Sequence, residues 1–461
     1  MRLLIGFLTL VLMVTACAAP GQPTSAPQGT EAPKAPAVVL DGTLKSSLLA
    51  TVMKTSPRDN VLLPIDPVSG AALPGYEPIS LGQTYFYALS RDRQILAVIS
   101  YPGDVTERGS LLLIDLPAWK VRRSELKLGG WVNAMAFSPD GKRLAVAHGE
   151  STYGLTMVDT QAGTIMVQAP TTYTVTHLKF TKSGEALMLY GPSIASGLEP
   201  DPPVVRLVKA ADLSTRWSAE LQDVRDGMFP KDETITQLEM YQPGNSIYFN
   251  PGLDFAPDRD ALYIVHSDSE RLTTVDFDAQ KVKTTDIQPK LSLSQRLLSL
   301  TAGVAHAKGE DGTSKQAVVS PDGQVLYVIG VRSTSLIQKG NLQTERTPLG
   351  LEIIRTSDGS RAAQIETDAS ELSLAPDGQL LYLRNWGSSV PWTEIFDTSN
   401  RRIIAHKEAL YGVPTLLING DFLLVSAYST SEISYPISVL EPDGSRLLGE
   451  WTSKQYVDVV R

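Results

Sequence analysis

The chain has 461 residues, of which 42% are hydrophobic and 20% are charged, so most of it can bury a core. Its formal net charge of −9 argues against a general nucleic-acid-binding role, because binding to phosphates needs a basic face. The single cysteine excludes an intramolecular disulfide, a zinc site built from cysteines and Cys–Cys redox chemistry.

The N-terminal segment has the pattern of an export signal. Arg2 supplies a positive charge, and residues 3–14 form an apolar run shorter than the roughly 20 residues that span a bilayer. Val14-Thr15-Ala16-Cys17 follows and resembles the bacterial lipobox, in which a small residue precedes the modified cysteine. The resemblance implies that the Cys17 thiol carries a diacylglyceryl group and that the chain is cleaved before it. The alternative is an ordinary secretory signal.

A spacer is expected after this signal. Residues 18–36 are rich in Pro, Ala, Gly, Ser and Thr, a composition that favours extended chain and cannot bury apolar area. The sequence therefore predicts a lipoprotein signal peptide over 1–16, a flexible linker over 17–36 and one folded domain over 37–461. Such a protein is exported and anchored in a lipid bilayer through acylated Cys17, at the cell surface or on the periplasmic face.

A turn motif repeats through the predicted domain. Ser138-Pro139-Asp140-Gly141 precedes an apolar run, and the pattern returns at 320–323 and 375–378. Proline presets φ, aspartate caps the turn and glycine takes the left-handed position, so each copy predicts a hairpin between two strands. Weaker copies occur at 90–93, 181–184, 256–259 and 418–421.

A second element follows each copy. It consists of an apolar run, an aspartate, a polar turn and another apolar run, as in Met157-Val158-Asp159-Thr160 and Ile395-Phe396-Asp397-Thr398. Each unit therefore has four strands, A to D, with tight A–B and C–D turns. The aligned turn residues 92, 140 and 183 are 48 and 43 residues apart, which matches one blade of a repeat propeller.

These units resemble the blades of YVTN-type and WD-repeat-like β-propellers, which carry a similar Ser-Pro-Asp-Gly turn before a Leu-Tyr-Val strand. The resemblance covers most of the chain after residue 37 and implies an all-β propeller of four-stranded antiparallel blades. Residues 38–70 also fit one unit, with a first strand at 38–42, which favours eight blades; the alternative is seven blades and an N-terminal extension. The fold family hosts unrelated activities, so this resemblance does not specify a function.

The sequence contains no pattern of a metal or catalytic site. Its five histidines lack zinc-ligand spacing, and neither a Gly-x-Ser-x-Gly elbow nor a P-loop occurs. We therefore expect that the protein binds no metal or cofactor and is not an enzyme. A propeller can nevertheless collect one residue from each blade at its central channel. A lactonase-like or quinoprotein-like enzyme with a site at the channel is therefore the alternative.

Long connections concentrate on one face of the predicted ring. Antiparallel blades place the A–B and C–D turns on one face, the turn face, and the B–C and D–A connections on the other, the insertion face. The long connections all belong to the insertion face, and they comprise residues 191–203, 222–246, 289–315 and 332–348. Long loops on a rigid scaffold commonly bind ligands, so we expect the binding surface there. Neutral drift of exposed loops is the alternative.

Candidate binding residues come from aligning the units. The residue that closes strand B is often polar, and aromatic residues sometimes follow it. This column supplies Ser100, His148, His266 and Asn385, with Tyr101, Trp386 and Tyr428 beside it. The simpler explanation is that small polar residues begin loops. A second alignment, on strand A, predicts that Lys179 and Asp254 approach each other across adjacent blades.

Together these patterns favour a binding or interaction module for a protein or glycan partner outside the cytoplasm. A further alternative is a scaffold subunit of a complex in the cell envelope.

Overall fold

The structure is a computed structural model of the whole chain. It describes residues 48–459 except for gaps at 56–57, 102–109, 128–130, 150–152, 193–200, 233, 237–238, 240–244, 288–309, 339–340, 386–391, 409–414, 417–422, 427–434 and 454–456. Cys17, the predicted signal peptide and the linker lie outside the described residues, as do Trp386 and Tyr428. The chain divides into a unit over residues 1–39 and a second unit over 40–461, and only the second contains described residues. Within that described part, no helix is long and apolar enough to cross a membrane.

Five of the seven described sheets consist of four consecutive antiparallel strands. They are formed by β7 (Val132–Phe137), β8 (Arg143–Gly149), β9 (Tyr153–Asp159) and β10 (Thr164–Thr171); β11 (His177–Phe180), β12 (Ala186–Gly191), β13 (Val204–Lys209) and β14 (Thr215–Glu220); β17 (Gly252–Phe255), β18 (Ala261–Val265), β19 (Arg271–Asp276) and β20 (Lys281–Asp286); β25 (Glu371–Leu374), β26 (Leu380–Asn385), β27 (Trp392–Asp397) and β28 (Arg402–Glu408); β29 (Thr415–Leu416), β30 (Leu423–Ser426), β31 (Tyr435–Leu440) and β32 (Leu447–Ser453).

The seven-stranded sheet joins the two ends of the described chain. Its order is β33-β1-β2-β3-β4-β5-β6, formed by β33 (Val457–Val459), β1 (Leu48–Thr55), β2 (Arg58–Ile65), β3 (Ile79–Leu89), β4 (Ile95–Tyr101), β5 (Ser110–Asp115) and β6 (Lys120–Lys127). The start of β3 pairs with β2 and its remainder pairs with β4, so two four-stranded units share this strand. The edge of β1 is covered by β33, where the sequence predicted a strand from residues 38–42. Pairing the chain's last strand with its first removes an open sheet edge.

The six-stranded sheet carries an addition to the four-strand plan. Its order is β15-β16-β21-β22-β23-β24, formed by β15 (Gly227–Pro230), β16 (Ser246–Asn250), β21 (Glu310–Val319), β22 (Val325–Gln338), β23 (Asn341–Arg355) and β24 (Arg361–Ile365). Strands β15 and β16 form a hairpin within an insertion, and β16 pairs in parallel with β21. Two of the predicted long connections are therefore at least partly strand.

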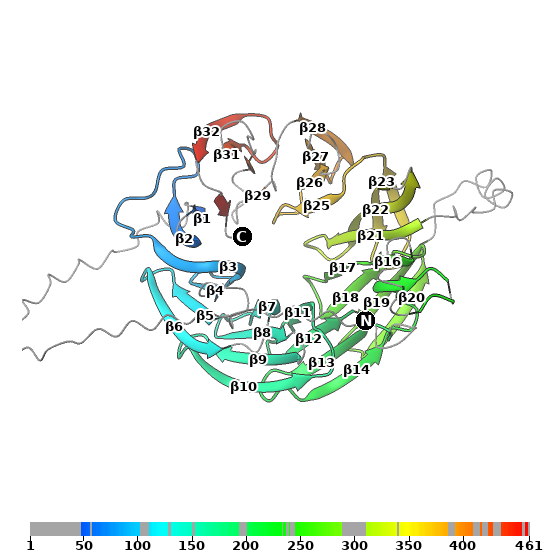
Figure 1. Cartoon of the computed structure of the whole chain (residues 1–461), viewed down its shortest axis with the longest axis horizontal. Coiled ribbons are helices and arrows are strands. Elements are labelled where there is room, and N and C mark those ends of the chain that lie inside the picture. Colours follow the sequence, from blue (N-terminus) through cyan, green and yellow to red (C-terminus); the bar gives the residue numbers. More distant parts are fainter. Residues whose placement is uncertain are drawn as a thin grey trace, which may run out of the picture. The chain divides into compact units, whose positions relative to one another are not determined.

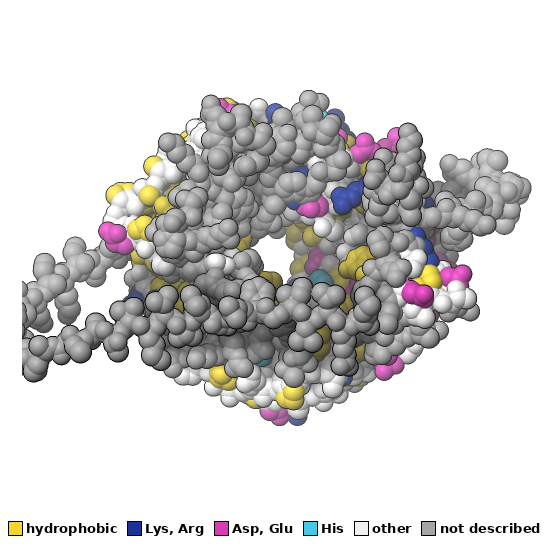
Figure 2. Space-filling view, viewed as in Figure 1, with side chains coloured by type: hydrophobic (Ala, Val, Ile, Leu, Met, Phe, Trp, Pro, Cys, Tyr) yellow, Lys and Arg dark blue, Asp and Glu magenta, His cyan; other side chains and the backbone are white. Residues whose placement is uncertain are grey.

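The sheets of residues 40–461 follow one another around a ring, which defines a β-propeller (Figure 1). The space-filling view shows an opening at the centre of this ring (Figure 2). The predicted fold class is confirmed. Eight blades stay a prediction, because the seven-stranded sheet must be divided at β3 to reach that number.

Apolar side chains pack between neighbouring sheets. All six residues of β12 are buried, which explains why this strand is apolar on both faces. Leu187 and Leu189 pack with Ala145 and Met157 of the preceding sheet, whereas Met188 packs with Leu262 of the next. Strand β12 thus contributes alternate residues to two cores, and burial of this apolar surface stabilises the ring.

The Ser-Pro-Asp-Gly motif forms the expected turn. The amide of Gly141, with a φ of 69°, donates to the carbonyl of Ser138 over 2.8 Å. The Ser138 hydroxyl donates to Asp140 over 2.6 Å and accepts from the amide of Arg143 over 2.9 Å. Its hydrogen bond to Asp140 lowers the pKa of that carboxyl. The weaker copy at 90–93 retains the backbone conformation, since Arg93 takes a φ of 57°.

Neighbouring turns lie against one another. The glycine of one turn contacts the turn of the preceding unit, at Gly141 against Asp92, Gly184 against Pro139, Gly323 against Asp258 and Gly378 against Pro321. The amide of Lys182 continues the series by donating to Asp260 over 2.8 Å. The prediction that the Pro-Asp-Gly turns share one face of the ring is confirmed.

Lys179 and Asp254 lie on adjacent sheets, and the alignment of strand A predicts that they approach each other. Burial lowers the pKa of Lys179, and the charge of Asp254 opposes this change, but no direct ion pair between the two forms within the described residues. Each group instead binds to backbone: the Lys179 ammonium donates to the carbonyl of Ala256 over 3.0 Å, and Asp254 accepts from the amide of Val319 over 2.7 Å. These contacts join three consecutive inner strands of the ring.

Candidate functional site

A cavity of about 530 Å³ lies between two neighbouring sheets on the insertion face. One wall is the loop that joins β18 to β19, and the other is the sheet from β21 to β24. We call it the Lys315 cavity, and its lining consists of Ser267, Asp268, Ser269, Glu270, Thr313, Lys315, Val328, Ile329, Gly330, Arg332, Leu349, Gly350, Glu352 and Gln364. Its volume is that of pockets that bind small molecules.

A bulge in the sheet shapes the floor of this cavity. The register between β22 and β23 shifts between Ile329 and Val331, where Leu349 and Gly350 face Gly330. Gly350 has a φ of 78°, a conformation that a side chain would strain. All three residues of the bulge line the cavity, so the irregular pairing creates part of the site.

Gly330 leaves room for a lysine on the adjacent strand. It pairs directly with Lys315 of β21, and a Cβ at position 330 would lie 3.0 Å from Cγ of Lys315. The lysine stem can therefore cross this position toward the cavity. Burial lowers the pKa of Lys315, while Glu352 and Glu270 oppose the change.

The acidic groups of the cavity are held by arginines. Arg361 lies 2.8 Å from Glu352 and 3.3 Å from Glu270, and thereby bridges the sheet to the β18–β19 loop. Asp268 lies 3.8 Å from Arg225. Each of these carboxylates therefore has an arginine as its ion-pair partner.

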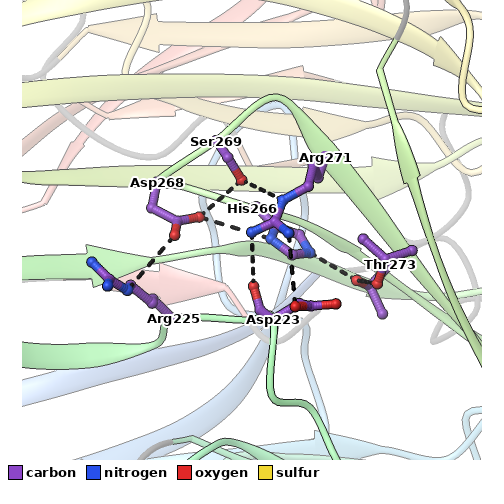
Figure 3. Close-up of polar contacts among 8 residues, drawn as sticks. Asp223, Arg225, His266, Asp268, Ser269, Arg271 and Thr273 are labelled. Atoms are coloured by element: carbon purple, nitrogen blue, oxygen red, sulfur yellow. Dashed lines mark hydrogen bonds and ion pairs between the residues drawn. The ribbon is translucent and has the colours of Figure 1, made fainter. Parts of the chain in front are cut away.

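The β18–β19 loop is fixed by residues of a third segment, the connection after β14 (Figure 3). Arg271 donates to the carbonyl of Asp223 over 3.2 Å and to the Ser269 hydroxyl over 3.0 Å. Arg225 approaches Asp268 from the same connection and also lies over the ring of Phe229. The wall of the cavity is thus positioned before any ligand arrives.

Two polar atoms beside this loop lack partners. The Ser267 hydroxyl is buried without a hydrogen bond in the described structure, and so is Nδ1 of His266. The other ring nitrogen of His266 lies 2.7 Å from the Thr273 hydroxyl. Burial, with a smaller contribution from Arg271, lowers the pKa of His266 to about 4, so this ring is neutral at pH 7.

The two histidines of the predicted column are buried. His148 is 4% exposed and His266 is 0% exposed, so the expectation that their side chains form an accessible rim is wrong. The His148 ring crosses Gly154 on the next strand and reaches the Thr156 hydroxyl at 2.9 Å. Both rings therefore bind a threonine inside their own sheet.

The other column residues lie at strand ends in different sheets. Ser100 is half-buried and pairs with Ser110, while Asn385 ends β26 and pairs with Trp392. Tyr101 ends β4, and its side chain is outside the described structure. These residues belong to different blades, and none of them lines the Lys315 cavity.

The predicted insertions have different structures. Residues 332–338 and 341–348 form the two arms of the β22–β23 hairpin rather than a loop, because their residue-by-residue pairing continues to Gln338 and Asn341. The connection 222–246 contains β15 and the anchors of the β18–β19 loop. Most of 191–203 and 289–315 lies outside the described residues, except that Lys315 and its neighbours belong to β21.

The predicted insertions surround the cavity, but the sequence does not predict the residues that define it. Lys315 was placed at the end of a connection, and Ser267 follows the column residue His266. A polar run His266-Ser267-Asp268-Ser269 after an apolar strand was the available signal. In the described part of the chain, no group of three or more His, Cys, Asp or Glu side chains is arranged to hold a metal ion.

Comparisons with known proteins agree with this architecture. The chain is similar to the dihydro-heme d1 dehydrogenase NirN in complex with DHE, with 14% identity, a TM-score of 0.55 and coverage of 92% of this chain and 77% of that chain. It is also similar to a eukaryotic initiation factor, with 11% identity, a TM-score of 0.50 and coverage of 89% and 97%. A third similar structure is the β-propeller domain of Myceliophteria thermophila Cps50 (Swd1), with 13% identity, a TM-score of 0.42 and coverage of 78% and 96%.

These similarities concern the fold alone. NirN is a β-propeller protein, and the present chain is a β-propeller as well. No protein-family model matches the chain, and no curated protein matches its sequence.

Proposed function

We propose that this propeller is a binding module that recognises its ligand at the Lys315 cavity. The observation that carries the proposal is a cavity of about 530 Å³ lined by charged and polar groups from two neighbouring sheets. Its loop wall is held by contacts to the connection after β14, so binding would order few additional side chains. A site prepared in this way loses little affinity to conformational entropy.

The partner is a protein or a glycan that inserts a small polar group into the cavity. The formal net charge of −9 supports a partner other than nucleic acid. The exposed rim residue Gln364 and the β22–β23 hairpin extend the contact surface around the cavity. These surroundings can supply affinity that a small cavity alone does not.

The module acts outside the cytoplasm, anchored in a membrane through acylated Cys17. Its support is the lipobox-like Val14-Thr15-Ala16-Cys17 and the Pro-rich spacer after it. Detergent partitioning and N-terminal mass analysis of wild type and Cys17→Ser test this part. We expect an acyl mass on the wild type and release of the variant from the membrane, whereas equal solubility of both contradicts it.

A photo-crosslinking experiment in intact envelopes tests the binding site. A benzophenone residue is placed at Gln364, at the cavity rim, or at Ser214, which is exposed in the turn between β13 and β14 on the turn face. We expect a discrete adduct from position 364 and none from 214. Ser269→Trp, which fills the cavity mouth, should remove the adduct, whereas Ser214→Trp should keep it. Equal adducts from both positions, or an adduct insensitive to Ser269→Trp, contradicts the proposal.

A further inference from the structure

The Ser267 hydroxyl is a buried polar group of the cavity without a hydrogen-bond partner in the described structure. Ser267 is 7% exposed and lines the cavity. An unsatisfied buried hydroxyl costs about 1–3 kcal/mol, and native proteins rarely keep one without a ligand or water to satisfy it. This hydroxyl can donate to, or accept from, a group inside the cavity.

The Lys315 ammonium is a second unsatisfied group of the same cavity. Among the residues that the structure describes, none accepts a hydrogen bond from it or forms an ion pair with it. Three other cations around the cavity are engaged: Arg361 with Glu352, Arg225 with Asp268, and Arg271 with Asp223. Lys315 is therefore a cation available for an incoming anion.

The charge balance of the cavity selects the kind of anion. Its lining carries the carboxylates Asp268, Glu270 and Glu352 and the cations Lys315 and Arg332, with Arg361 adjoining two of the carboxylates. These six formal charges cancel. A phosphate monoester would bring a charge of about −1.5 to −2 close to three carboxylates, whereas a carboxylate brings a single charge.

The carboxylates that line the cavity, which we call its acidic wall, can contact the rest of the ligand. Ionised carboxylates only accept hydrogen bonds, so Glu270 and Glu352 can receive N–H or O–H groups of a ligand. A small acid with an ammonium or hydroxyl groups beside its carboxylate would satisfy both walls at once. An amino acid and an acidic sugar share this chemistry.

We propose that the ligand carries a carboxylate that accepts hydrogen bonds from the Lys315 ammonium and the Ser267 hydroxyl, with donor groups facing the acidic wall. This inference rests on the proposed binding function and narrows it to a chemical class. The carboxylate belongs to a free small acid or to the acidic group of a larger partner.

Isothermal titration of the full chain with defined probes tests the inference. The probes are sodium glucuronate and alanine, with glucose, alaninamide and inorganic phosphate as comparisons. We expect one or both carboxylates to bind, the forms without a carboxylate to bind at least tenfold more weakly, and phosphate to bind more weakly than the carboxylate. Binding of glucuronate but not alanine identifies an acidic sugar, and the reverse identifies an amino acid.

Substitutions assign the effect to the two residues. Lys315→Met should lower the affinity at least tenfold and Ser267→Ala about threefold, whereas Lys281→Met, at an exposed lysine of β20, should leave it unchanged. If Lys315→Met does not fold, reductive methylation of the wild type and NMR titration replace it. The Lys315 signal should then shift on carboxylate addition, with a rise in its pKa.

Failure of this inference can be distinguished from failure of the proposed function. If neither carboxylate binds but Ser269→Trp still removes the adduct at Gln364, the proposed ligand class is wrong, while the proposed location of the binding site is supported. Carboxylate binding that Lys315→Met leaves unchanged, or phosphate binding at equal affinity, also overturns the inference. If the adduct itself is insensitive to Ser269→Trp, the proposed function fails.

Discussion

The two faces of the ring differ in how fully their polar groups are hydrogen-bonded. On the turn face, serine hydroxyls bind aspartates, and a threonine after the third strand binds the carbonyl of the turn glycine, as Thr160 does to Gly141 over 2.7 Å. On the insertion face, Ser267 and His266 each keep a buried atom without a hydrogen-bond partner in the described structure, and Lys315 forms no ion pair with a described residue. A closed hydrogen-bond network stabilises a repeat, whereas recognition needs unsatisfied groups beside a cavity. This contrast indicates which face is available for function.

A large loss of stability is expected on the turn face. Gly323→Val should destabilise the protein by about 2 kcal/mol or more, because a β-branched residue is strained at φ 71° and its Cβ would overlap Asp258. Gly163→Val is the control, since Gly163 has a φ of 66° but nothing lies near its Cβ position. Gly163→Val should lose only about 1 kcal/mol of stability, because backbone strain is its sole cost. Denaturant unfolding measures both, and equal losses would show that the contact between turns contributes nothing.

The next effect tests a buried acid on the insertion face. The Tyr190 hydroxyl donates to Asp226 over 2.6 Å, and burial raises the pKa of Asp226 from 3.8 to about 6. A raised pKa stabilises the folded protein below pH 4, and this contribution is lost as the pH rises to about 6. Asp226→Asn should therefore gain stability relative to wild type between pH 4 and pH 7, by up to about 3 kcal/mol.

Asp322, on the turn face, provides the control with the opposite sign. The Ser320 hydroxyl lowers its pKa, so its contribution is present above pH 4 and is lost as the pH falls further. The difference in the free energy of unfolding between Asp322→Asn and wild type should therefore stay constant from pH 5 to pH 7. Chemical denaturation at several pH values measures both variants. If the free energies of unfolding of Asp226→Asn and wild type varied with pH in the same way, this would contradict the assigned burial of Asp226.

A smaller effect on stability is expected at the tip of the β22–β23 hairpin. Replacing residues 335–346 by a short Gly-Ser turn keeps Arg332 and Leu349 of the cavity and changes only the projecting arms. Loop-closure cost varies slowly with length, so the free energy of unfolding should change by less than about 1 kcal/mol. The adduct at Gln364 should nevertheless weaken. A matched replacement of residues 161–163 on the turn face should leave the adduct unchanged, and equal behaviour of both variants would exclude the hairpin from the contact surface.

The smallest effect concerns Lys179 and Asp254, which lie on neighbouring inner strands. Each binds backbone groups rather than the other, so a double-mutant cycle with Lys179→Met and Asp254→Asn should give a coupling energy below about 1 kcal/mol. A larger coupling would show that the two side chains pair directly. Thermal or denaturant unfolding of the four proteins measures it.

The fold was predictable because each motif residue has one local role. Proline, aspartate and glycine specify the turn, and the aligned spacing of these turns specifies the repeat. The cavity was not predictable in the same way. Lys315 and Ser267 line the same cavity only because two sheets pack, and the bulge at Gly330 lies where the sequence indicated the start of a loop. His148 was misplaced because the glycine opposite it lets the ring turn into the sheet.

The pairing of β33 with β1 has a consequence for the order of folding. The strand that completes the first sheet is Val457–Val459, within the last residues of the chain, whereas β1 begins at Leu48. During synthesis, the edge of β1 therefore stays unpaired until residues 457–459 have been made. A truncated product lacks that partner and exposes a strand edge that can pair with other chains. Pairing of β33 with β1 thus makes closure of the ring depend on residues 457–459.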